Sequence, residues 1–523
     1  MQLHHIVANT ASRRGDAPAL TYKNQTLTYT ELSRAITGVA SGLRALGLKR
    51  DERVAVYLDK RIETVTAIFG TSAADGVFVP INPVLRAKQV AYILDNCSVR
   101  ILITSPERLE ALRDELTECP SVEQIVLVGP VTDTQSGGRR VTSWDDLTRS
   151  EPVSPQEKAG PGVIDLDMAA ILYTSGSTGK PKGVVLSHRN LIAGAESVSH
   201  YLENTADDVI LAALPLSFDA GFSQLTTAFS VGAHAVLVNY LLPDDVIRLC
   251  AKHKVTGLTA VPPLWIQLVE KPWPAEAAQH LRYFANTGGR MPKATLDRLR
   301  ATFPNATPYL MYGLTEAFRS TYLDPTQVDR RPDSIGKAIP NAEILVVRPD
   351  GGICDPGEQG ELVHRGALVS LGYWKDPERT AERFRPAPAR EDGLCMPEMA
   401  VWSGDMVVRD EDGFLYFVGR KDEMIKTSGY RVSPTEIEEV VYSTGLVRDA
   451  VALGVEDEKL GQRVLLVVSP VNGHALDTVA LIAALKKELP LYMLPKDVVV
   501  RPELPRSPNG KFDRNLLRQE LAS

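Results

Sequence analysis

The sequence lacks several patterns that would mark particular classes of protein. It has five cysteines among 523 residues, scattered without CxxC spacing, so neither a disulfide framework nor a cysteine metal site is expected. No stretch reaches the roughly 18 uncharged apolar residues that a membrane-spanning helix needs. Positive charge is not in excess, because the net charge is -7, and this argues against binding to nucleic acid or to an anionic membrane.

The N-terminus also lacks the pattern of a targeting signal. Residues 1–16, MQLHHIVANTASRRGD, hold a short apolar patch that histidines interrupt and two arginines follow. We therefore expect a cytoplasmic protein. The 44% hydrophobic and 24% charged residues are ordinary for a globular protein, and 523 residues are too many for one ordinary core. Two or more domains and small-molecule chemistry are expected, while the oligomeric state stays open.

Alternating strand-like and helix-like segments indicate an α/β fold up to about residue 340. Between the apolar runs, residues 31–46 place apolar side chains at three- and four-residue spacing, which is typical of a helix packed against a sheet. The pattern predicts a large N-terminal domain of layered, largely parallel sheets. The clearest predicted strands, rich in valine, isoleucine and leucine, are 53–58, 100–104, 124–128, 234–238 and 342–347.

The pattern changes twice towards the C-terminus. From 333 to 419 glycines are dense and the predicted strands are short, which favours a small β-subdomain. After Arg420 a new alternation begins, and the segment SPTEIEEVV predicts a helix with Ser433 as N-cap, Pro434 in its first turn and Glu436 completing a capping box. The expected division is an N-terminal domain over 1–419, a hinge at 420–422 and a small α+β domain over 423–523.

A glycine- and hydroxyl-rich loop, YTSGSTGKPKG at 173–183, lies between two apolar runs. Its glycines allow backbone conformations that other residues avoid, its hydroxyls can donate hydrogen bonds, and its two lysines carry positive charge. A loop of this kind can wrap the phosphates of a nucleotide. The residues predicted to do so are Thr174, Ser175, Gly176, Ser177, Thr178, Gly179, Lys180 and Lys182.

Two other interpretations of this loop are weaker. A Walker A loop, GxxxxGK[ST], needs glycine at position 174 and serine or threonine at position 181, where the chain has Thr174 and Pro181. This mismatch removes the main support for a kinase or a GTPase. A plain surface connector is the other alternative, but connectors rarely combine two lysines with four hydroxyls between buried strands.

Further motifs stand before and after the loop in a fixed order along nearly the whole chain. They are LTYTEL at 27–32, GVFVPINP at 76–83, LPLSFDAGFSQL at 214–225, MYGLTEA at 311–317, GELVHRG at 360–366, SGD at 403–405, GRKDEMIKTSGYRVSPTEIE at 419–438 and PRSPNGKFDR at 505–514. With the loop, this set resembles the adenylate-forming superfamily, which includes acyl- and aryl-CoA synthetases, adenylation domains of nonribosomal peptide synthetases and firefly luciferase. MYGLTEAFRSTYL and RRPDSIGKAIPNAE most resemble stand-alone acyl-CoA ligases associated with exosortase A gene clusters.

The resemblance implies roles around the nucleotide. Glu316, preceded by Thr315, would hold Mg²⁺ on the ATP phosphates, because a hard cation prefers carboxylate oxygen. Its alternative is a solvated acid in a loop. Asp405 and Arg420 would bind the ribose hydroxyls, since a carboxylate can accept two hydrogen bonds from a vicinal diol.

The adenine base has its own set of implied neighbours. Tyr312, followed by Gly313, would lie against the base. Gly288 and Gly289 in NTGGR would let the backbone approach the adenine closely, although a simple turn is a fair alternative.

The C-terminal motif implies the catalytic lysine and a domain movement. Lys511 resembles the family lysine that bridges the attacking carboxylate and the α-phosphate, where its charge offsets developing negative charge. In the family the C-terminal domain rotates after adenylation, with the residue matching Asp422 as the hinge. The segment matching Gly429 and Arg431 then meets the incoming thiol, and a side chain at position 429 would block the pantetheine tunnel.

The acid-binding residues are implied less sharply. Asp219, next to Phe218, matches the position where amino-acid-activating adenylation domains place an aspartate against the substrate ammonium group. A buried aspartate is costly unless it is paired, so a substrate ammonium is one partner, while a helix cap or a protein cation is the alternative. Arg319 could point into the same pocket and bind a substrate carboxylate, or it could form an outward salt bridge.

The leading hypothesis is an ATP- and Mg²⁺-dependent AMP-forming acid:thiol ligase. The acceptor would be CoA or the phosphopantetheine of a separate carrier protein, since the chain ends at Ser523 soon after the catalytic lysine. The acid would be an amino acid if Asp219 binds an ammonium group, and otherwise a plain acyl or aryl acid. Luciferase-like oxygenation of the adenylate and a non-catalytic nucleotide sensor are the remaining alternatives.

Overall fold

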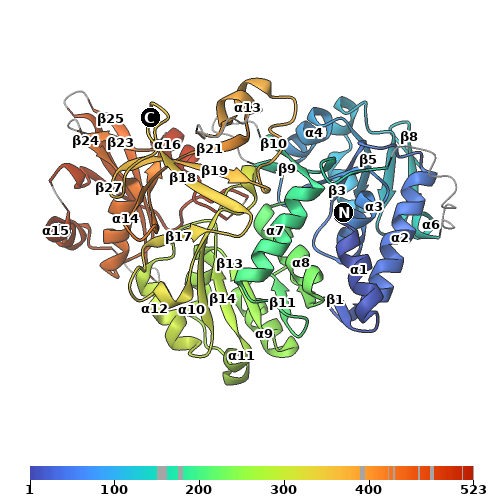
Figure 1. The fold of residues 1–523 in the computed structure, drawn as a ribbon, viewed down its shortest axis with the longest axis horizontal. Helices are drawn as coiled ribbons and strands as arrows, with labels where there is room; N and C mark the ends of the chain where they lie inside the picture. Colours follow the sequence, from blue (N-terminus) through green and yellow to red (C-terminus); the bar gives the residue numbers. More distant parts are fainter. Residues whose placement is uncertain are drawn as a thin grey trace.

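In the computed structural model, strands and helices alternate along the N-terminal part of the chain, as the apolar pattern predicts (Figure 1). The predicted loop residues Ser175–Lys180 and the predicted hinge and tunnel residues Asp422 and Gly429 lie outside the described residues, as does the side chain of Arg431. The described residues are 1–132, 134–149, 162–174, 181–388, 395–421, 423–427, 430–457, 460–471, 476–489, 491–508 and 510–521.

One large sheet is built from residues before position 190. Its central strands pair in parallel, whereas β9 and β10 form an antiparallel hairpin on either side of the predicted phosphate loop. Within the described residues this sheet has eight strands in the order β10-β9-β4-β3-β5-β6-β8-β7. They are β10 (Lys182–Ser187), β9 (Met168–Thr174), β4 (Val77–Pro80), β3 (Arg53–Tyr57), β5 (Val99–Thr104), β6 (Gln124–Leu127), β8 (Arg139–Ser143) and β7 (Gln135–Ser136).

A second, longer sheet continues into the region where the β-subdomain is predicted. Strands β1 and β11–β15 pair in parallel, and antiparallel pairing of β16 with β17 extends the same sheet into residues 334–420. The glycine-rich region is thus an antiparallel extension of the second sheet. In sheet order the strands are β18 (Ala342–Val347), β19 (Gln359–Gly366), β21 (Met399–Arg409), β22 (Leu415–Arg420), β17 (Ser334–Ala338), β16 (Thr321–Leu323), β15 (Thr307–Tyr312), β14 (Tyr283–Asn286), β13 (Gly257–Ala260), β11 (Val209–Ala212), β12 (His234–Leu237), β1 (Pro18–Tyr22) and β2 (Gln25–Thr28), with β20 (Phe384–Pro386) beside β21.

Helices join the two sheets through one continuous core. Phe222 of α8 shows the connection, because its ring lies 5.9 Å from that of Phe69 in α3 and 5.2 Å from that of Phe78 in β4. Burial of large aromatic rings on both sides stabilises this arrangement. The helices are α1 (His5–Arg14), α2 (Tyr29–Ala45), α3 (Ile62–Ala73), α4 (Ala87–Asn96), α5 (Pro106–Leu112), α6 (Trp144–Thr148), α7 (His188–Tyr201), α8 (Asp219–Val231), α9 (Pro243–His253), α10 (Pro262–Val269), α11 (Ala275–His280), α12 (Lys293–Thr302) and α13 (Pro377–Arg383).

The last hundred residues form their own sheet and core. Strand β26 pairs with β23, β25 and β27, and apolar residues of α14 and α15 pack on this sheet in one cluster. Ser433 caps α14 by accepting a hydrogen bond from the Glu436 N–H, which is the one half of the predicted capping box among the described contacts. The elements are β23 (Ile425–Thr427), β24 (Tyr430–Val432), α14 (Pro434–Ser443), β25 (Val447–Asp457), β26 (Gly461–Pro470), α15 (Thr478–Glu488), β27 (Asp497–Val500) and α16 (Arg514–Leu521).

The strands and the helix expected from the sequence are confirmed. The five predicted strands correspond to β3, β5, β6, β12 and β18, and the predicted helix is α2, capped by a reciprocal pair of hydrogen bonds between Thr28 and Glu31. Cys97, Cys119, Cys250 and Cys354 are buried, whereas Cys395 is exposed. Among the described residues no helix is long and apolar enough to cross a membrane, and no cluster of three metal-ligating side chains occurs.

Three buried histidines make this fold sensitive to acid. Burial lowers the pKa of His188 and His234 to about 4 and that of His364 to about 3, because desolvation disfavours the charged imidazolium. These side chains are neutral in the folded protein and take up protons when it unfolds. Their contribution to stability is therefore present above the ordinary pKa of 6.5 and is lost as the pH falls towards the folded value.

We expect His364→Gln to weaken this pH dependence. Between about pH 7.5 and about pH 4.5, the wild-type free energy of unfolding should fall by roughly 2 to 3 kcal/mol more than that of the variant, since only the imidazole takes up a proton. Urea unfolding at the two pH values measures the difference. Equal losses in the two proteins would contradict the role given to His364.

Candidate active site

The predicted phosphate loop spans the gap between two paired strands. Thr174 at the end of β9 stands opposite Lys182 at the start of β10, so the strand pairing brings the two ends of the predicted loop together. The Oγ1 atom of Thr174 is buried and has no hydrogen-bond partner among the described residues. A buried orphaned hydroxyl beside a loop of this composition fits a site that a ligand completes.

Lys182 links this loop to the predicted metal ligand Glu316. Its Nζ donates to Glu316 Oε1 at 2.8 Å, and both groups contact the hydroxyl of Tyr373, which donates to the same carboxylate oxygen at 2.5 Å. Although burial opposes ionisation, Lys182 and then Tyr373 lower the pKa of Glu316 to about 2. The carboxylate is thus ionised across the ordinary pH range, as a ligand for a hard cation must be.

Glu316 lies in a short turn that also positions its neighbours. Thr315 opens the 3₁₀ helix Thr315–Ala317, and Phe318 then reverses the chain with a φ of 57°. Few residues other than glycine adopt this backbone conformation, and such strain concentrates at functional sites. The reversal directs Arg319 into the protein, where only 3% of its side chain is exposed.

Asp405 and Arg420 meet because their strands are paired in register. Asp405 of β21 stands opposite Arg420 of β22, and Arg420 Nη1 lies 3.5 Å from Asp405 Oδ1. Tyr312 donates its hydroxyl hydrogen to Asp405 Oδ2. Burial raises the pKa of Asp405, and Arg420, Tyr312 and Lys511 oppose that rise. The predicted ribose pair and the predicted adenine neighbour therefore form one cluster.

The predicted glycine pair forms a close approach at the end of β14. Gly288 has a φ of 75°, in the left-handed region that favours glycine, and a Cβ there would lie 3.2 Å from Val261. Asn286 donates to the carbonyl of Gly289 at 2.8 Å, which leaves its buried Oδ1 without a partner among the described residues. Gly313, the residue after Tyr312, is also closely packed, because a Cβ there would stand 3.2 Å from the Cα of Arg319.

Lys511 lies at the same site although it belongs to the C-terminal sheet region. A tight turn presents it, because Ser507 N–H donates to the Lys511 carbonyl at 2.7 Å and Asp513 N–H donates to Pro505 at 2.9 Å. Its Cε lies 3.6 Å from the point where a Cβ would stand at Gly288. The structure therefore brings Lys511 to the predicted nucleotide site.

Two contacts between the N-terminal and C-terminal regions hold this arrangement. Asn82 Nδ2 donates to the carbonyl of Pro508 at 3.0 Å, three residues before Lys511. Arg290 forms ion pairs with Asp333 at 2.9 Å and with Glu439 of α14. One contact involves the turn that carries Lys511, and the other involves Arg290, which is two residues from Gly288. The contacts therefore hold the two regions together at the place where the predicted site residues meet.

The predicted acid-binding residues also meet, but as an ion pair. Arg319 Nη1 lies 3.1 Å from Asp219 Oδ2 and also donates to the carbonyl of Phe318. Asp219 is the first residue of α8, and Phe218 precedes it as the N-cap residue. Pairing with a protein cation, the alternative weighed for Asp219, is therefore observed. The outward orientation considered for Arg319 is wrong, because its guanidinium is buried against this carboxylate.

Five buried polar atoms of this region lack hydrogen-bond partners among the described residues. They come from strands β9, β14 and β21 and from the loop segments before α8 and after the 3₁₀ helix, and unsatisfied groups of this kind are expected where a polar ligand binds. The donors and acceptors suit a nucleotide and a carboxylic acid. The atoms are Thr174 Oγ1, Ser217 Oγ, Asn286 Oδ1, Arg319 Nε and Asp405 Oδ1.

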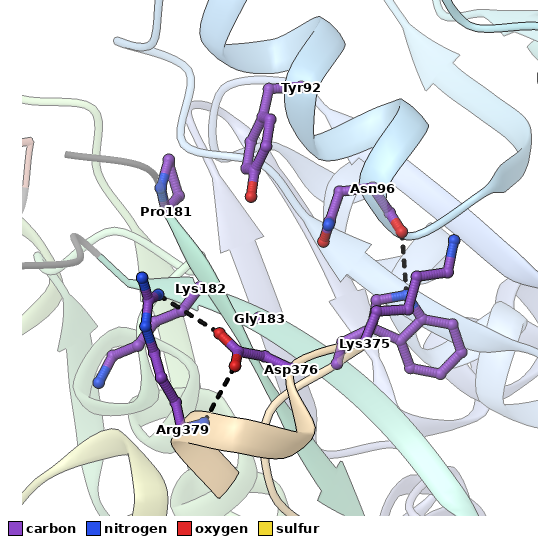
Figure 2. Close-up of a pocket in the computed structure, with 9 residues that line it drawn as sticks. Tyr92, Asn96, Pro181, Lys182, Gly183, Lys375, Asp376 and Arg379 are labelled. Carbon is purple, nitrogen blue, oxygen red and sulfur yellow. Dashed lines mark hydrogen bonds and ion pairs between the residues drawn. The ribbon is translucent and has the colours of Figure 1, made fainter. Parts of the chain in front are cut away.

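A cavity of about 360 Å³ is lined in part by Pro181, Lys182 and Gly183, at the C-terminal end of the predicted phosphate loop. Figure 2 shows Tyr92 and Asn96 on one side of it and Asp376 and Arg379 on the other, with Lys182 extending away from Asn96. Trp374 donates its indole N–H to the carbonyl of Asn96 at 3.1 Å and so closes the wall. The cavity adjoins the loop without containing Asp405, Glu316 or Lys511.

Comparison with known proteins agrees with the geometry. Residues 7–374 match the AMP-binding enzyme family, and residues 436–511 match the AMP-binding enzyme C-terminal domain. A long-chain-fatty-acid–CoA ligase of Salmonella typhimurium is 30% identical over 99% of this chain and 94% of its own length. An L-proline–[L-prolyl-carrier protein] ligase of Streptomyces coelicolor is 33% identical over 93% of this chain and 91% of its own.

Larger proteins and solved structures are similar as well. The chain spans 6% of the length of a linear gramicidin synthase protein from Brevibacillus parabrevis, at 30% identity over 98% of this chain. The structure of ATP-bound MatB from Rhodopseudomonas palustris superposes with a TM-score of 0.85 at 25% identity, covering 100% of this chain and 99% of that chain.

The fold and the site together define an adenylate-forming enzyme. The chain belongs to the AMP-binding enzyme family. Its reaction class is that of an AMP-forming acid–thiol ligase. The narrower likeness to exosortase-associated ligases stays a prediction.

Sequence reasoning missed several residues of the site. Tyr373 follows the GELVHRG motif at no informative spacing, and it reaches Glu316 because it pairs with Val184 of β10. Asn286 and Asn82 are single polar residues at strand ends, and the sequence carries no signal that pairs them with Gly289 or Pro508. These partners are evident only in the three-dimensional structure.

We expect Tyr373→Phe to slow adenylation about tenfold, because the Glu316 carboxylate loses the hydrogen bond donated by the Tyr373 hydroxyl, worth about 1.4 kcal/mol. Acid-dependent ATP–pyrophosphate exchange measures this rate. Tyr29→Phe is the matched control, since it removes a buried hydroxyl that donates to the Ala233 carbonyl at 2.6 Å in the core. An exchange rate for Tyr373→Phe equal to that of wild type would contradict the assignment.

Proposed function

We propose that this chain uses ATP and Mg²⁺ to activate a small amino-bearing carboxylic acid and passes the acyl group to a thiol. The acceptor is CoA or the phosphopantetheine of a separate carrier protein, and AMP and pyrophosphate are released. The observation that carries the choice of acid is Asp219, which keeps 15% of its side chain exposed beside the buried Arg319. A carboxylate in this position can accept a hydrogen bond from a substrate ammonium group.

The first half-reaction joins the acid to the α-phosphorus of ATP. A carboxylate oxygen attacks that phosphorus, and the bond to pyrophosphate breaks, so that acyl-AMP and pyrophosphate form. Lys511 would bridge the attacking carboxylate and the α-phosphate, since its positive charge offsets the charge that accumulates there. Asp405 and Arg420 would hold the ribose, and Tyr312, Gly288 and Gly289 would surround the base.

The phosphates would be held by the loop at 174–182 and by Glu316. Mg²⁺ bound at Glu316 would supply positive charge to the phosphate oxygens, and its preference for one or two carboxylates plus phosphate suits a site with a single ionised glutamate. Lys182, which donates to this carboxylate at 2.8 Å, would add a second positive charge beside the phosphates. Thr315 would orient Glu316 from the preceding position.

The second half-reaction transfers the acyl group to sulfur. The thiol attacks the acyl carbonyl carbon, the bond to AMP breaks, and the thiol proton is lost to solvent. We infer that the domain 423–523 rotates about the hinge 420–422, centred on Asp422, relative to the domain 1–419. The rotation would withdraw Lys511 and bring Gly429 and Arg431 to the thiol.

A second candidate acid is a plain acyl or aryl acid. The 3.1 Å ion pair between Arg319 and Asp219 favours it, because a carboxylate already neutralised by a protein cation has less need of a substrate ammonium. Relatives of both kinds are known, since one acts on L-proline and another on long-chain fatty acids. A pyrophosphate-exchange screen over amino, aryl and fatty acids separates the two candidates directly.

We expect Lys511→Ala to abolish adenylation and to spare thiol transfer from a chemically prepared acyl-adenylate. The reason is that the lysine faces the α-phosphate only in the first half-reaction. Pyrophosphate exchange measures the first step, and thioester formation from added adenylate measures the second. Lys487→Ala, an exposed lysine of α15, is the control. Equal loss of both steps in Lys511→Ala would refute the assigned role.

The choice of acid is tested with a pair of variants of opposite expected effect. Asp219→Asn should lower kcat/KM for amino-bearing acids roughly tenfold to a hundredfold, because a charged hydrogen bond worth about 1.5 to 3 kcal/mol is lost. Arg319→Met should raise the preference for amino-bearing over plain acids, because Asp219 then lacks its protein cation. If both variants lower kcat/KM equally for all acids, the ion pair between Asp219 and Arg319 has a structural role and the plain-acid candidate holds.

A further inference from the structure

A buried lysine lies next to the acid-binding residues and has no role in the reaction described above. Lys60, between β3 and α3, is 9% exposed, and its ammonium group donates to the carbonyls of Ala212 at 2.9 Å, Ala213 at 2.8 Å and Leu214 at 3.2 Å. These three bonds use all three N–H donors of the ammonium. Within the described residues no carboxylate forms an ion pair with it.

Burying the Lys60 ammonium group is unfavourable unless its hydrogen bonds compensate for the loss of hydration. Burial lowers the pKa of Lys60 to about 7, because desolvation disfavours the charged form. Its neighbours Asp59 and Arg61 pair elsewhere, with Arg108 and Glu63. The three charge-assisted bonds to carbonyls are thus what hold the ammonium in place, and by the same contacts the ammonium holds the carbonyls.

The carbonyls that Lys60 binds form the junction between β11 and the acid-binding segment, residues 214–225. On the other side of this junction Gln224 donates to the Leu211 carbonyl at 3.0 Å and accepts from the Leu214 N–H at 3.1 Å. A Cβ at Gly221 would stand only 1.9 Å from the Pro215 carbonyl oxygen, so the first turn of α8 packs directly on the junction. The segment is therefore fixed from two sides.

The junction is close in sequence to the residues that face the acid. Ser217, with its buried unpartnered Oγ, and Asp219 follow Leu214 by three and five residues. Phe218 N–H donates to the Pro215 carbonyl at 3.3 Å, which ties the start of α8 to the same bend. A shift of the bend would move Ser217 and Asp219 together, while Asp405 and Glu316 are positioned by other strands.

We propose that Lys60 is a positioning residue for the acid-binding segment, and that it determines the affinity for the acid substrate rather than for ATP. The proposal rests on the proposed function only in placing the acid beside Asp219. It holds for an amino-bearing acid and for a plain acid alike. A purely structural role predicts instead that stability and both substrate affinities fall together.

The test compares Lys60→Met with wild type in acid-dependent pyrophosphate exchange. We expect the KM for the acid to rise about tenfold or more while the KM for ATP stays within about twofold. Lys487→Met is the matched control for loss of a lysine. Thermal unfolding of each protein records any loss of stability.

A milder variant keeps the proposal testable if Lys60→Met does not fold. Asn239 holds the backbone of Lys60 by accepting from its N–H at 3.1 Å and donating to its carbonyl at 2.7 Å. Asn239→Ala should therefore raise the KM for the acid by a smaller factor, again without a change for ATP. An unchanged KM for the acid, or equal rises for acid and ATP, overturns the proposal. Absence of exchange by wild type with every acid would instead refute the proposed function.

Discussion

The ion pair between Lys182 and Glu316 connects the two parts of the protein that make the nucleotide site. Lys182 begins the strand after the phosphate loop in the first sheet, and Glu316 lies in the turn after the central strands of the second. Their 2.8 Å contact, supported by Tyr373, lowers the pKa of the carboxylate to about 2 and holds the turn that lies between Tyr312, at the end of β15, and Arg319. Because the residues proposed to face the metal, the base and the acid lie in or beside this one short turn, the position of the turn would determine the geometry of the proposed site.

The acid-binding residues depend on a different set of contacts. Arg319 enters from the turn and pairs with Asp219 at the start of α8, while Lys60 holds the bend that leads into that helix. Both cations are buried and both bind groups of the same segment. Among the described residues, those proposed for the nucleotide and those proposed for the acid thus belong to separate networks that meet at the turn, and this separation would allow one pocket to change without disturbing the other.

Sequence reasoning predicted the strands and helices better than the contacts between them. Valine- and isoleucine-rich runs identified β3, β5 and β12, because burial on both faces leaves a strong local signal. The contacts of Tyr373 with Glu316 and of Lys60 with Ala212 join residues 57 and 152 positions apart, and no local pattern encodes them. The motif at 173–183 indicated a phosphate-binding loop. The reaction assigned to this loop depended on residues from other parts of the chain, such as Glu316 and Asp405.

The central claim is that the acid is activated by direct attack on the α-phosphorus of ATP. Supplying the acid with heavy oxygen in its carboxylate, together with ATP and a thiol acceptor, tests it in one measurement, the mass of the nucleotide product. Attack by the carboxylate followed by thiol transfer leaves one labelled oxygen in AMP. Unlabelled AMP, or ADP as the product, would contradict the account.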